Sequence, residues 1–267
     1  MINFQITSTY QFFIENFHGL IPQEQALNHN IPKRFFILMH GRSGSSLLVS
    51  LLDSHPKIKC SSEIFYKQPT RYPYKLISGL ERYYRYRRGS DIAWGFKAKL
   101  EQIEKCGVTH EEFFDYLIER NTTIISLIRD NIFRSAISVL IAGKRGNIFH
   151  NSSEKISNYA PVNLNPKQVL AVMKQRQFQK EKIQTLISRL PVDVLQLKYE
   201  EHLSDIHRHN STCSLIFNAL DIESVPVTSS FKKMTNNKLS DSVINAEEVV
   251  NFIAASQFYE YVANVII

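Results

Sequence analysis

The pattern of apolar and polar positions in residues 33–56 predicts a strand, a turn and a helix, in that order. Residues 35–39 form a short continuous apolar run, which is typical of a strand buried on both faces of a parallel sheet. A glycine-containing turn follows this run. From Ser45 onwards leucines recur with the period of a helix, and the apolar face that they form ends before Pro56.

The same alternation of strand-like and helix-like segments continues downstream. Three further strands are expected, at 92–100, 123–128 and 192–197. Helices are expected at 111–119, 132–141, 166–190, 200–203 and 247–263. Strands that alternate with helices predict an α/β fold, in which helices flank a central parallel β-sheet. Ligands of such sheets bind beyond the carboxyl ends of the strands, so residues at those ends are the candidates for a site.

The composition is typical of a globular protein with one large domain. The chain has 267 residues, of which 43% are hydrophobic and 21% are charged. Nine glycines and nine prolines exclude a collagen-like or linker-dominated chain, and 17 Phe with 12 Tyr exclude a disordered one. Because no repeat or Ser/Gly-rich linker interrupts the sequence, we expect a lead-in at 1–32 and a single domain at 33–267.

The N-terminus and the cysteines favour a cytoplasmic protein. No apolar run reaches the 18 or so residues of a membrane span, and the first residues lack both a basic leader and a cleavage site. Cys60, Cys106 and Cys213 lie too far apart for a CxxC motif, and their odd number argues against a disulfide framework. We expect these cysteines to be reduced and structural.

Residues 40–46, His-Gly-Arg-Ser-Gly-Ser-Ser, occupy the turn between the first strand and the first helix. Glycines allow a tight turn there, so that successive backbone N–H groups and the positive helix end face one anion. Ser45 and Ser46 add hydroxyl donors, and Arg42 adds a fixed charge. The turn therefore predicts an anion-binding loop, with a simple helix-capping role as the alternative.

The loop differs from that of a nucleoside triphosphatase. Such a loop would read GxxxxGK[ST], with the Lys on the terminal phosphates and the hydroxyl on magnesium. That pattern is absent, and the strand at 123–128 is followed by Arg129 ahead of Asp130 rather than by an obvious carboxylate for a metal. A nucleotide kinase is therefore the less favoured alternative, and no metal is expected.

Three features together resemble a known family. A strand ending in GRSGSS, a later strand ending in Arg, and a helical Ser about two turns beyond it resemble the sulfotransferases that use 3′-phosphoadenosine 5′-phosphosulfate (PAPS). The likeness is greatest to the bacterial branch that sulfates carbohydrates such as trehalose and nodulation factors. It extends loosely over 33–264 and is strongest at 35–65 and 123–138. The resemblance implies a P-loop NTPase-like sulfotransferase fold, PAPS as cofactor, adenosine 3′,5′-bisphosphate as product, and no metal.

The resemblance also assigns the nucleotide-binding residues. Arg42 would neutralise the leaving phosphate, while Arg129 and Ser138 would grip the 3′-phosphate. The spacing of these last two residues is nine, where many relatives have eight, so Arg134 and Ser135 remain open as partial substitutes. The residues that would bind the 5′-phosphosulfate are Gly41, Arg42, Ser43, Gly44, Ser45 and Ser46. The residues of a late basic loop that would close over the nucleotide are Ser230, Lys232 and Lys233.

Sulfuryl transfer needs a base near the acceptor and cations near the leaving group. The resemblance nominates Glu63 as that base, because relatives place a Glu at a corresponding position; an ordinary surface or capping glutamate is the alternative. His40 and His55 are rival bases, and we expect both to be structural. Lys97 and Lys99 alternate along a strand and would share one face, where Lys97 would contact the sulfuryl oxygens or the acceptor unless that face is solvated.

The function implied is in-line transfer of a sulfuryl group from PAPS to a hydroxyl, or an amine, of a small polar acceptor, with Glu63 as general base. A sugar or glycolipid is the family default, and a specialised metabolite such as an alkaloid is the second choice. The family also includes homodimers, so a homodimer is expected here.

The net charge of +7 points to a polyanionic partner, which could be a nucleic acid, an anionic membrane surface or a phosphorylated cofactor. Residues 71–89 interleave Tyr with Arg, a composition that can stack and pair with single-stranded nucleic acid. No complete recognition motif accompanies this stretch. We therefore favour a basic helix near the acceptor cleft or the solvent, expect no nucleic-acid partner, and keep a basic nucleic-acid-binding protein as the alternative from another functional class.

Overall fold

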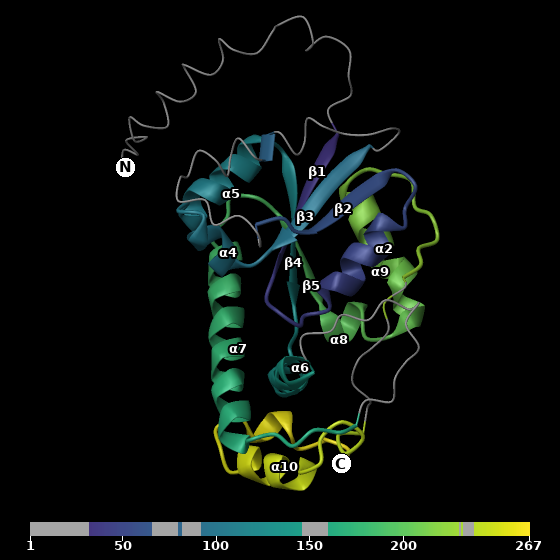
Figure 1. Cartoon of the computed structure of the whole chain (residues 1–267). Helices are drawn as coiled ribbons and strands as arrows, with labels where there is room; N and C mark the ends of the chain where they lie inside the picture. Colours follow the sequence, from purple (N-terminus) through teal and green to yellow (C-terminus); the bar gives the residue numbers. More distant parts are fainter. Residues whose placement is uncertain (1–31, 66–79, 82–91, 146–159, 230, 232–237) are drawn as a thin grey trace, which may run out of the picture. The chain divides into compact units, whose positions relative to one another are not determined.

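The computed structural model describes residues 32–65, 80–81, 92–145, 160–229, 231 and 238–267, and residues 32–267 form one compact unit. Within it, five strands form one sheet with the order β2-β3-β1-β4-β5, and every pairing is parallel (Figure 1). The strands are β1 (Lys33–Met39), β2 (Ile58–Glu63), β3 (Ala93–Ala98), β4 (Thr122–Ile128) and β5 (Val194–Lys198). The predicted α/β fold with a central parallel sheet flanked by helices is confirmed.

The helices follow the strands in the alternation that the sequence predicts. Those that flank or extend the sheet are α2 (Ser45–Asp53), α4 (Leu100–Lys105), α5 (His110–Glu119), α6 (Ile132–Lys144), α7 (Pro166–Ile187), α8 (Tyr199–His202), α9 (His209–Ala219) and α10 (Ala246–Ala254). Two short 3₁₀ helices are η3 (Ile206–Arg208) and η4 (Tyr259–Tyr261). In the described residues no helix is long and apolar enough to cross a membrane.

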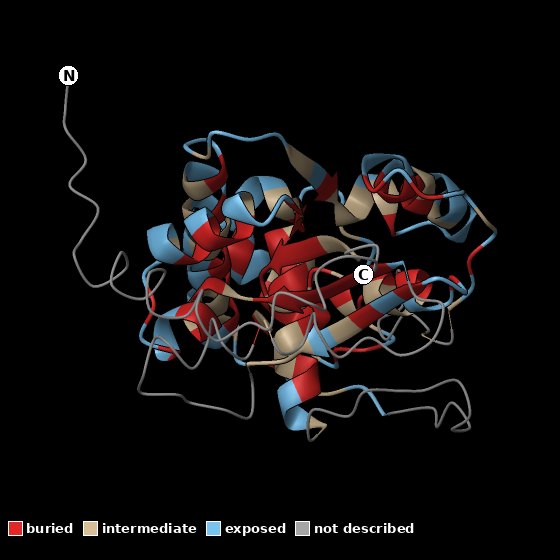
Figure 2. Ribbon diagram, turned by 90° about the horizontal axis from the view of Figure 1, so that it is seen from above, coloured by how far each residue is buried: buried red, intermediate tan, exposed pale blue. Residues whose placement is uncertain are grey.

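The core has a layer on each face of the sheet because successive side chains of a strand point to opposite sides. Phe36 and Leu38 of β1 pack with α4, α5 and the end of α7, whereas Phe35 and Ile37 pack with α2 and α9. A third apolar cluster joins α6, α7 and α10 beyond the sheet. Figure 2 shows the result: the strands are largely buried and the outer faces of the helices are exposed.

Some elements differ from the expected ones. The strand β2 was not predicted, because its sequence IKCSSE is largely polar and only alternate residues are buried. The run at 92–100 is shorter as a strand, because Lys99 leaves the sheet and the helix α4 begins directly after it. The helix expected at 247–263 ends at Ala254 and is followed by a 3₁₀ turn.

The three cysteines are free and buried, as predicted. Burial raises the pKa of the Cys213 thiol to about 12 and raises that of Cys60 as well, so both remain protonated at neutral pH. They therefore act as small apolar core side chains.

Candidate anion-binding site

The loop between β1 and α2 has an unusual backbone that the sequence motif makes possible. Arg42 and Gly44 both have left-handed φ values, of 65° and 87°. A Cβ atom at Gly44 would lie 2.5 Å from the ring of Tyr199, so only glycine fits there. At Arg42 the left-handed backbone costs a non-glycine residue about 1 kcal/mol, and strain of this kind is commonly found at binding sites.

Two arginines from separate parts of the sequence meet at this loop. Arg129 directly follows β4, and its Nη1 donates a hydrogen bond of 3.3 Å to the carbonyl oxygen of Arg42. The Nε of Arg42 in turn donates to Oγ of Ser138, on α6, at 3.0 Å. Because β1 and β4 are paired neighbours in the sheet, the two predicted motifs lie at one edge and in direct contact.

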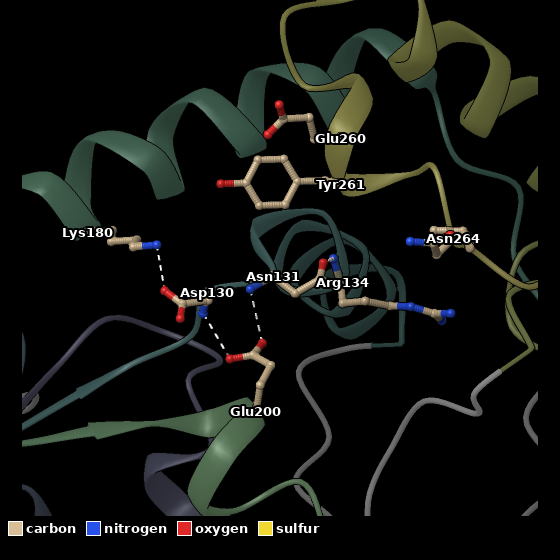
Figure 3. A pocket seen from close by; sticks show the side chains of 9 residues that line it. Asp130, Asn131, Arg134, Lys180, Glu200, Glu260, Tyr261 and Asn264 are labelled. Carbon is tan, nitrogen blue, oxygen red and sulfur yellow. Dashed lines mark hydrogen bonds and ion pairs between the residues drawn. The ribbon is translucent and has the colours of Figure 1, made fainter.

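The helix α8, at the end of β5, supports Arg129. The Arg129 guanidinium lies 4.5 Å from the centre of the Tyr199 ring, and its Nε is 3.6 Å from Oε1 of Glu200. The Glu200 carboxylate also accepts hydrogen bonds from the backbone N–H groups of Asp130 and Asn131, at 2.9 and 3.0 Å (Figure 3). Tyr199 and Glu200 were missing from the sequence-based set of site residues. Together they fix Arg129 against the loop.

Further positive charge reaches the loop from α7. Both terminal nitrogens of Arg176 lie 3.5 Å from the position that a Cβ on Gly41 would take. Arg176 is 9% exposed, and its hydrogen-bond partner is a neutral amide, Oε1 of Gln179 at 2.6 Å. Among the described residues no carboxylate forms an ion pair with Arg176. Nothing in the local sequence distinguishes Arg176 from the many other polar positions of its helix.

The arginines at this edge disfavour one another's charge. Burial lowers the pKa of Arg42, Arg129, Arg134 and Arg176, with burial as the first cause in each case. The neighbouring charges of Arg129 and Arg176 lower the pKa of Arg42 further, and that of Arg129 lowers the pKa of Arg134. A bound polyanion would reverse this effect, since an opposite charge within a few ångströms favours the charged form.

His40 connects the ends of the same two strands. Its Nε2 lies 3.0 Å from the backbone nitrogen of Arg129, and its Nδ1 lies 3.1 Å from the carbonyl oxygen of Gly41. Burial first, and nearby cations second, lower the pKa of His40 to about 4, so the ring is neutral at neutral pH. A neutral ring that donates from Nδ1 and accepts at Nε2 fits both contacts. His55 has a similar role, because its two ring nitrogens contact backbone atoms of Lys57 and Glu223. Both histidines are therefore structural.

Lys97 is buried beneath the loop rather than lying on a solvated strand face. It is 2% exposed, and its Nζ lies 2.9 Å from Oγ of Ser46 and 3.3 Å from Oγ of Ser45. Burial lowers the pKa of Lys97 to about 8. A lysine from a neighbouring strand thus reaches the first turn of α2, where the motif itself carries no lysine.

Glu63, at the end of β2, is hydrogen-bonded to Lys99, and its charge also raises the pKa of Lys97 against the larger effect of burial. Its Oε2 accepts hydrogen bonds from Nζ of Lys99 at 3.0 Å and from Nε2 of Gln102 at 2.6 Å. No hydrogen bond to its Oε1 is formed by any described residue. Lys99 also passes within 3.7 Å of the Cβ position at Gly41, so the predicted base lies beside the loop through this lysine.

A cavity beside the arginines is not suited to phosphate. This α6–α7 pocket has a volume of about 590 Å³ and is lined by three carboxylates, those of Asp130, Glu200 and Glu260, against two cations. Figure 3 shows Lys180 paired with Asp130 across it, while Arg134 extends away from that pair.

Several sequence-based candidates have no structural outcome. Ser230, Lys232, Lys233 and the Tyr/Arg stretch at 71–89, apart from Leu80 and Glu81, lie outside the described residues. Within the described part of the chain, no group of three or more His, Cys, Asp or Glu side chains could hold a metal ion.

Comparison with known proteins finds likeness only at the level of structure. No protein-family model matches the chain, and neither does any curated protein. A sulfotransferase from Alicyclobacillus acidocaldarius has a similar structure, with 17% identity, a TM-score of 0.48, and coverage of 87% of this chain and 94% of its own. A sulfotransferase domain from the curacin biosynthetic pathway has 15% identity and a TM-score of 0.44, with coverage of 74% and 77%. Likenesses this distant carry no argument about the reaction.

Proposed function

We propose that the protein is a PAPS-dependent sulfotransferase, which moves a sulfuryl group to a hydroxyl or amine of a small acceptor. The observation that carries the proposal is the contact between the two basic motifs: Arg129 donates to the Arg42 carbonyl, and Arg42 donates to Ser138. A ligand with phosphate at both ends of a nucleoside would match two such motifs at neighbouring strand ends.

The residues at this edge fit a nucleotide of that kind. The 5′-phosphosulfate would lie against the loop N–H groups, the hydroxyls of Ser45 and Ser46, and the Lys97 ammonium. Arg129 and Ser138 would hold the 3′-phosphate. The hydroxyl of Ser43, which the resemblance also assigns to the 5′-phosphosulfate, is fully buried and has no hydrogen-bond partner among the described residues.

Each side chain then has a defined part in the transfer. Bound PAPS would supply an activated sulfuryl group, so the protein supplies a base, cations and alignment. Glu63 would accept the acceptor proton at Oε1, while Lys99 and Gln102 hold its other oxygen. In such a transfer the acceptor oxygen or nitrogen would take the sulfuryl group, and the phosphate of the cofactor would be the leaving group. Arg42 and Lys97 would stabilise the negative charge left on that phosphate.

Calorimetric titration of the full chain tests the nucleotide. We expect adenosine 3′,5′-bisphosphate to bind more tightly than adenosine 5′-monophosphate, because Arg129 and Ser138 gain a phosphate partner only with the former. ATP with Mg²⁺ is the competing ligand, and tight binding of ATP alone would favour a nucleotide kinase instead. Incubation with ³⁵S-labelled PAPS and a metabolite extract, followed by mass analysis of the labelled product, tests the transfer.

A further inference from the structure

A second cavity lies between the end of β1 and the helices α4 and α7. This α4–α7 pocket has a volume of about 270 Å³ and is lined by His40 and Leu100 together with residues of α4 and α7. His40 precedes Gly41 of the loop, and Leu100 follows Lys99. Two residues of the pocket wall are therefore sequence neighbours of Gly41, in the loop, and of Lys99, the partner of the proposed base.

A chain of polar contacts fixes this wall to the loop. Arg176, which lies against Gly41, donates to Oε1 of Gln179, and Nε2 of Gln179 donates to Oε1 of Glu101 in α4. Gln179 and Glu101 both line the pocket. A molecule in the pocket would therefore be held at a set distance from the loop.

The pocket has an apolar floor and an aromatic edge. Met39, Leu100 and Ile183 line it and are buried, whereas Phe178 lines it from α7 and is 65% exposed. An exposed phenyl ring on an otherwise polar helix surface is a contact for a flat apolar group, or for a cation over the ring face.

The charge of the residues that line the pocket decides between a neutral apolar ligand and a cation. Glu104 is neutralised by Lys182, at 2.6 Å, and lies 3.3 Å from Nε2 of His110. Glu101 accepts from the neutral Gln179 amide and forms no ion pair with any described residue. His40 is neutral at neutral pH, since its pKa is about 4.

Glu101 also acts on a buried cation behind the lining. Its charge raises the pKa of Arg176 against the effect of burial, although the Arg176 guanidinium contacts Gly41 and Gln179 and does not line the pocket. Of the two carboxylates that line the pocket, Glu101 is the one without an ion pair to another lining residue. This contrasts with the strongly basic edge next to it and with the net charge of +7 of the whole chain.

We propose that the α4–α7 pocket binds the sulfuryl acceptor, and that this acceptor is a small organic cation with a flat apolar portion and a separate hydroxyl or amine that takes the sulfuryl group. The cationic group would pair with Glu101 and lie near Phe178. The nucleophile must be a different and uncharged group, because a protonated amine has no lone pair for attack on sulfur. The inference rests on the proposed function, whose loop supplies the donor beside this pocket.

A matched series of three phenols tests the charge preference. Tyramine, 4-ethylphenol and 3-(4-hydroxyphenyl)propionate share a flat ring and a hydroxyl, and differ in carrying a cation, no charge or an anion. Binding to the full chain is measured by ligand-observed NMR, with and without saturating adenosine 3′,5′-bisphosphate. We expect tyramine to bind about fivefold more tightly than 4-ethylphenol, and the propionate to bind most weakly.

Two variants and a control test which residues cause the preference for the cationic phenol. Glu101→Gln keeps an acceptor for Gln179 but removes the charge, so the ratio between tyramine and 4-ethylphenol should fall to about one. Phe178→Ala should weaken both ligands by a similar factor of about three, because it removes ring contact rather than charge. Glu111→Gln, at an exposed position of α5, is the matched control and should leave the ratio as in the unaltered protein.

Other outcomes overturn the pocket assignment. Equal binding of the three phenols, preference for the propionate, no binding of any of them, or an unchanged ratio in Glu101→Gln would each do so. The nucleotide titration on the same samples is a separate readout. Failure of adenosine 3′,5′-bisphosphate to bind overturns the proposed function, whereas the phenol ratios measured without nucleotide still report on the pocket.

Discussion

Arginines at the two ends of the parallel strands have opposite electrostatic surroundings. At the amino edge, where the amino ends of the strands lie, Arg34 and Arg120 form ion pairs with one carboxylate, that of Glu81. At the carboxyl edge, Arg42 and Arg129 contact each other. The first arrangement is a closed charge network and the second is an accumulation of like charge, although both are built on β1 and β4 or on the segments next to them.

At the amino edge, the charge of Glu81 is balanced by neighbouring donors and cations. Oε1 of Glu81 accepts from the Tyr116 hydroxyl at 2.8 Å and from Nε of Arg120 at 3.0 Å, and lies 3.6 Å from Nη1 of Arg34. Burial opposes the charge of Glu81, but these donors outweigh it and lower the pKa of the carboxyl. Burial likewise opposes the charge of Arg120, and Glu81 outweighs it, so the pKa of Arg120 is raised. These charges favour the folded state.

At the carboxyl edge burial is not outweighed, and the pKa values of the arginines are lowered. Charge that is unfavourable in the folded chain alone becomes favourable when an anion binds. Under the proposed function, the difference between the edges would separate arginines that stabilise the fold from arginines that bind a ligand.

The largest effect is expected from Arg129→Met. Loss of a buried cation that holds a phosphate should weaken adenosine 3′,5′-bisphosphate by about a hundredfold or more. The free energy of unfolding of the ligand-free protein should stay the same or rise, because the variant removes a charge that burial disfavours. Titration calorimetry and urea unfolding measure the two quantities.

Arg120→Met is the matched control for that variant at the other edge. It should leave the affinity for the nucleotide within about twofold of the original, since surface changes far from a site rarely alter binding more. If Arg129→Met and Arg120→Met weakened the nucleotide equally, the proposed division between the two edges would be wrong.

The second effect concerns stability. Glu81→Gln should lower the free energy of unfolding by about 2 kcal/mol, because the variant leaves cations and the Tyr116 hydroxyl without a carboxylate. The nucleotide affinity should not change. Urea unfolding followed by circular dichroism measures the loss, and a protein as stable as the original would show that the amino-edge network contributes nothing.

The loop and Arg129, which follow central strands, were easier to predict from the sequence than the edge strand β2. The loop at 40–46 and Arg129 were recognisable because central strands are continuous apolar runs, and the residues that follow them are easily located. The strand β2 was missed because an edge strand buries only alternate residues, and its pairing with β3 depends on residues more than 30 positions away. Glu63 was nominated as the base from the resemblance, and its place at a strand end was not predicted.

Residues that reach the site from other elements were beyond sequence reasoning. Arg176 comes from the middle of a long polar helix, and its orientation depends on how α7 packs against α6. Tyr199 and Glu200 begin a four-residue helix at the end of β5. The general rule that strand ends form sites could have nominated this pair. Their contacts with Gly44 and Arg129 follow only from the folded chain.

A smaller and more selective effect is expected from Glu200→Gln. Glu200 holds Arg129, so the variant should weaken adenosine 3′,5′-bisphosphate by about tenfold and adenosine 5′-monophosphate much less, because only the former has the 3′-phosphate. The ratio of the two dissociation constants is the readout, since general damage to the fold would weaken both. Glu201→Gln, at the exposed neighbour that pairs with Lys198, is the control.

The smallest effect follows from the pKa of Lys97, about 8 in the ligand-free protein. As the pH rises through this value the ammonium loses its charge, so the nucleotide should bind about fourfold more weakly at pH 8.5 than at pH 7. The nucleotide phosphates do not contribute, because they are already ionised at pH 7. Lys97→Met should remove this pH dependence, and an equal slope in both proteins would assign it to another group.

The same titration should act in the opposite direction on stability. Between pH 8 and the ordinary lysine pKa of about 10.4, the unfolded chain binds a proton that the folded chain does not. The free energy of unfolding without nucleotide should therefore gain from Lys97 as the pH rises through this window, while the nucleotide affinity falls. If the charges at the carboxyl edge bind a ligand and destabilise the ligand-free fold, the free energy of unfolding and the nucleotide affinity must change in opposite directions with pH. If both quantities fell together, Lys97 would belong with the stabilising charges of the amino edge.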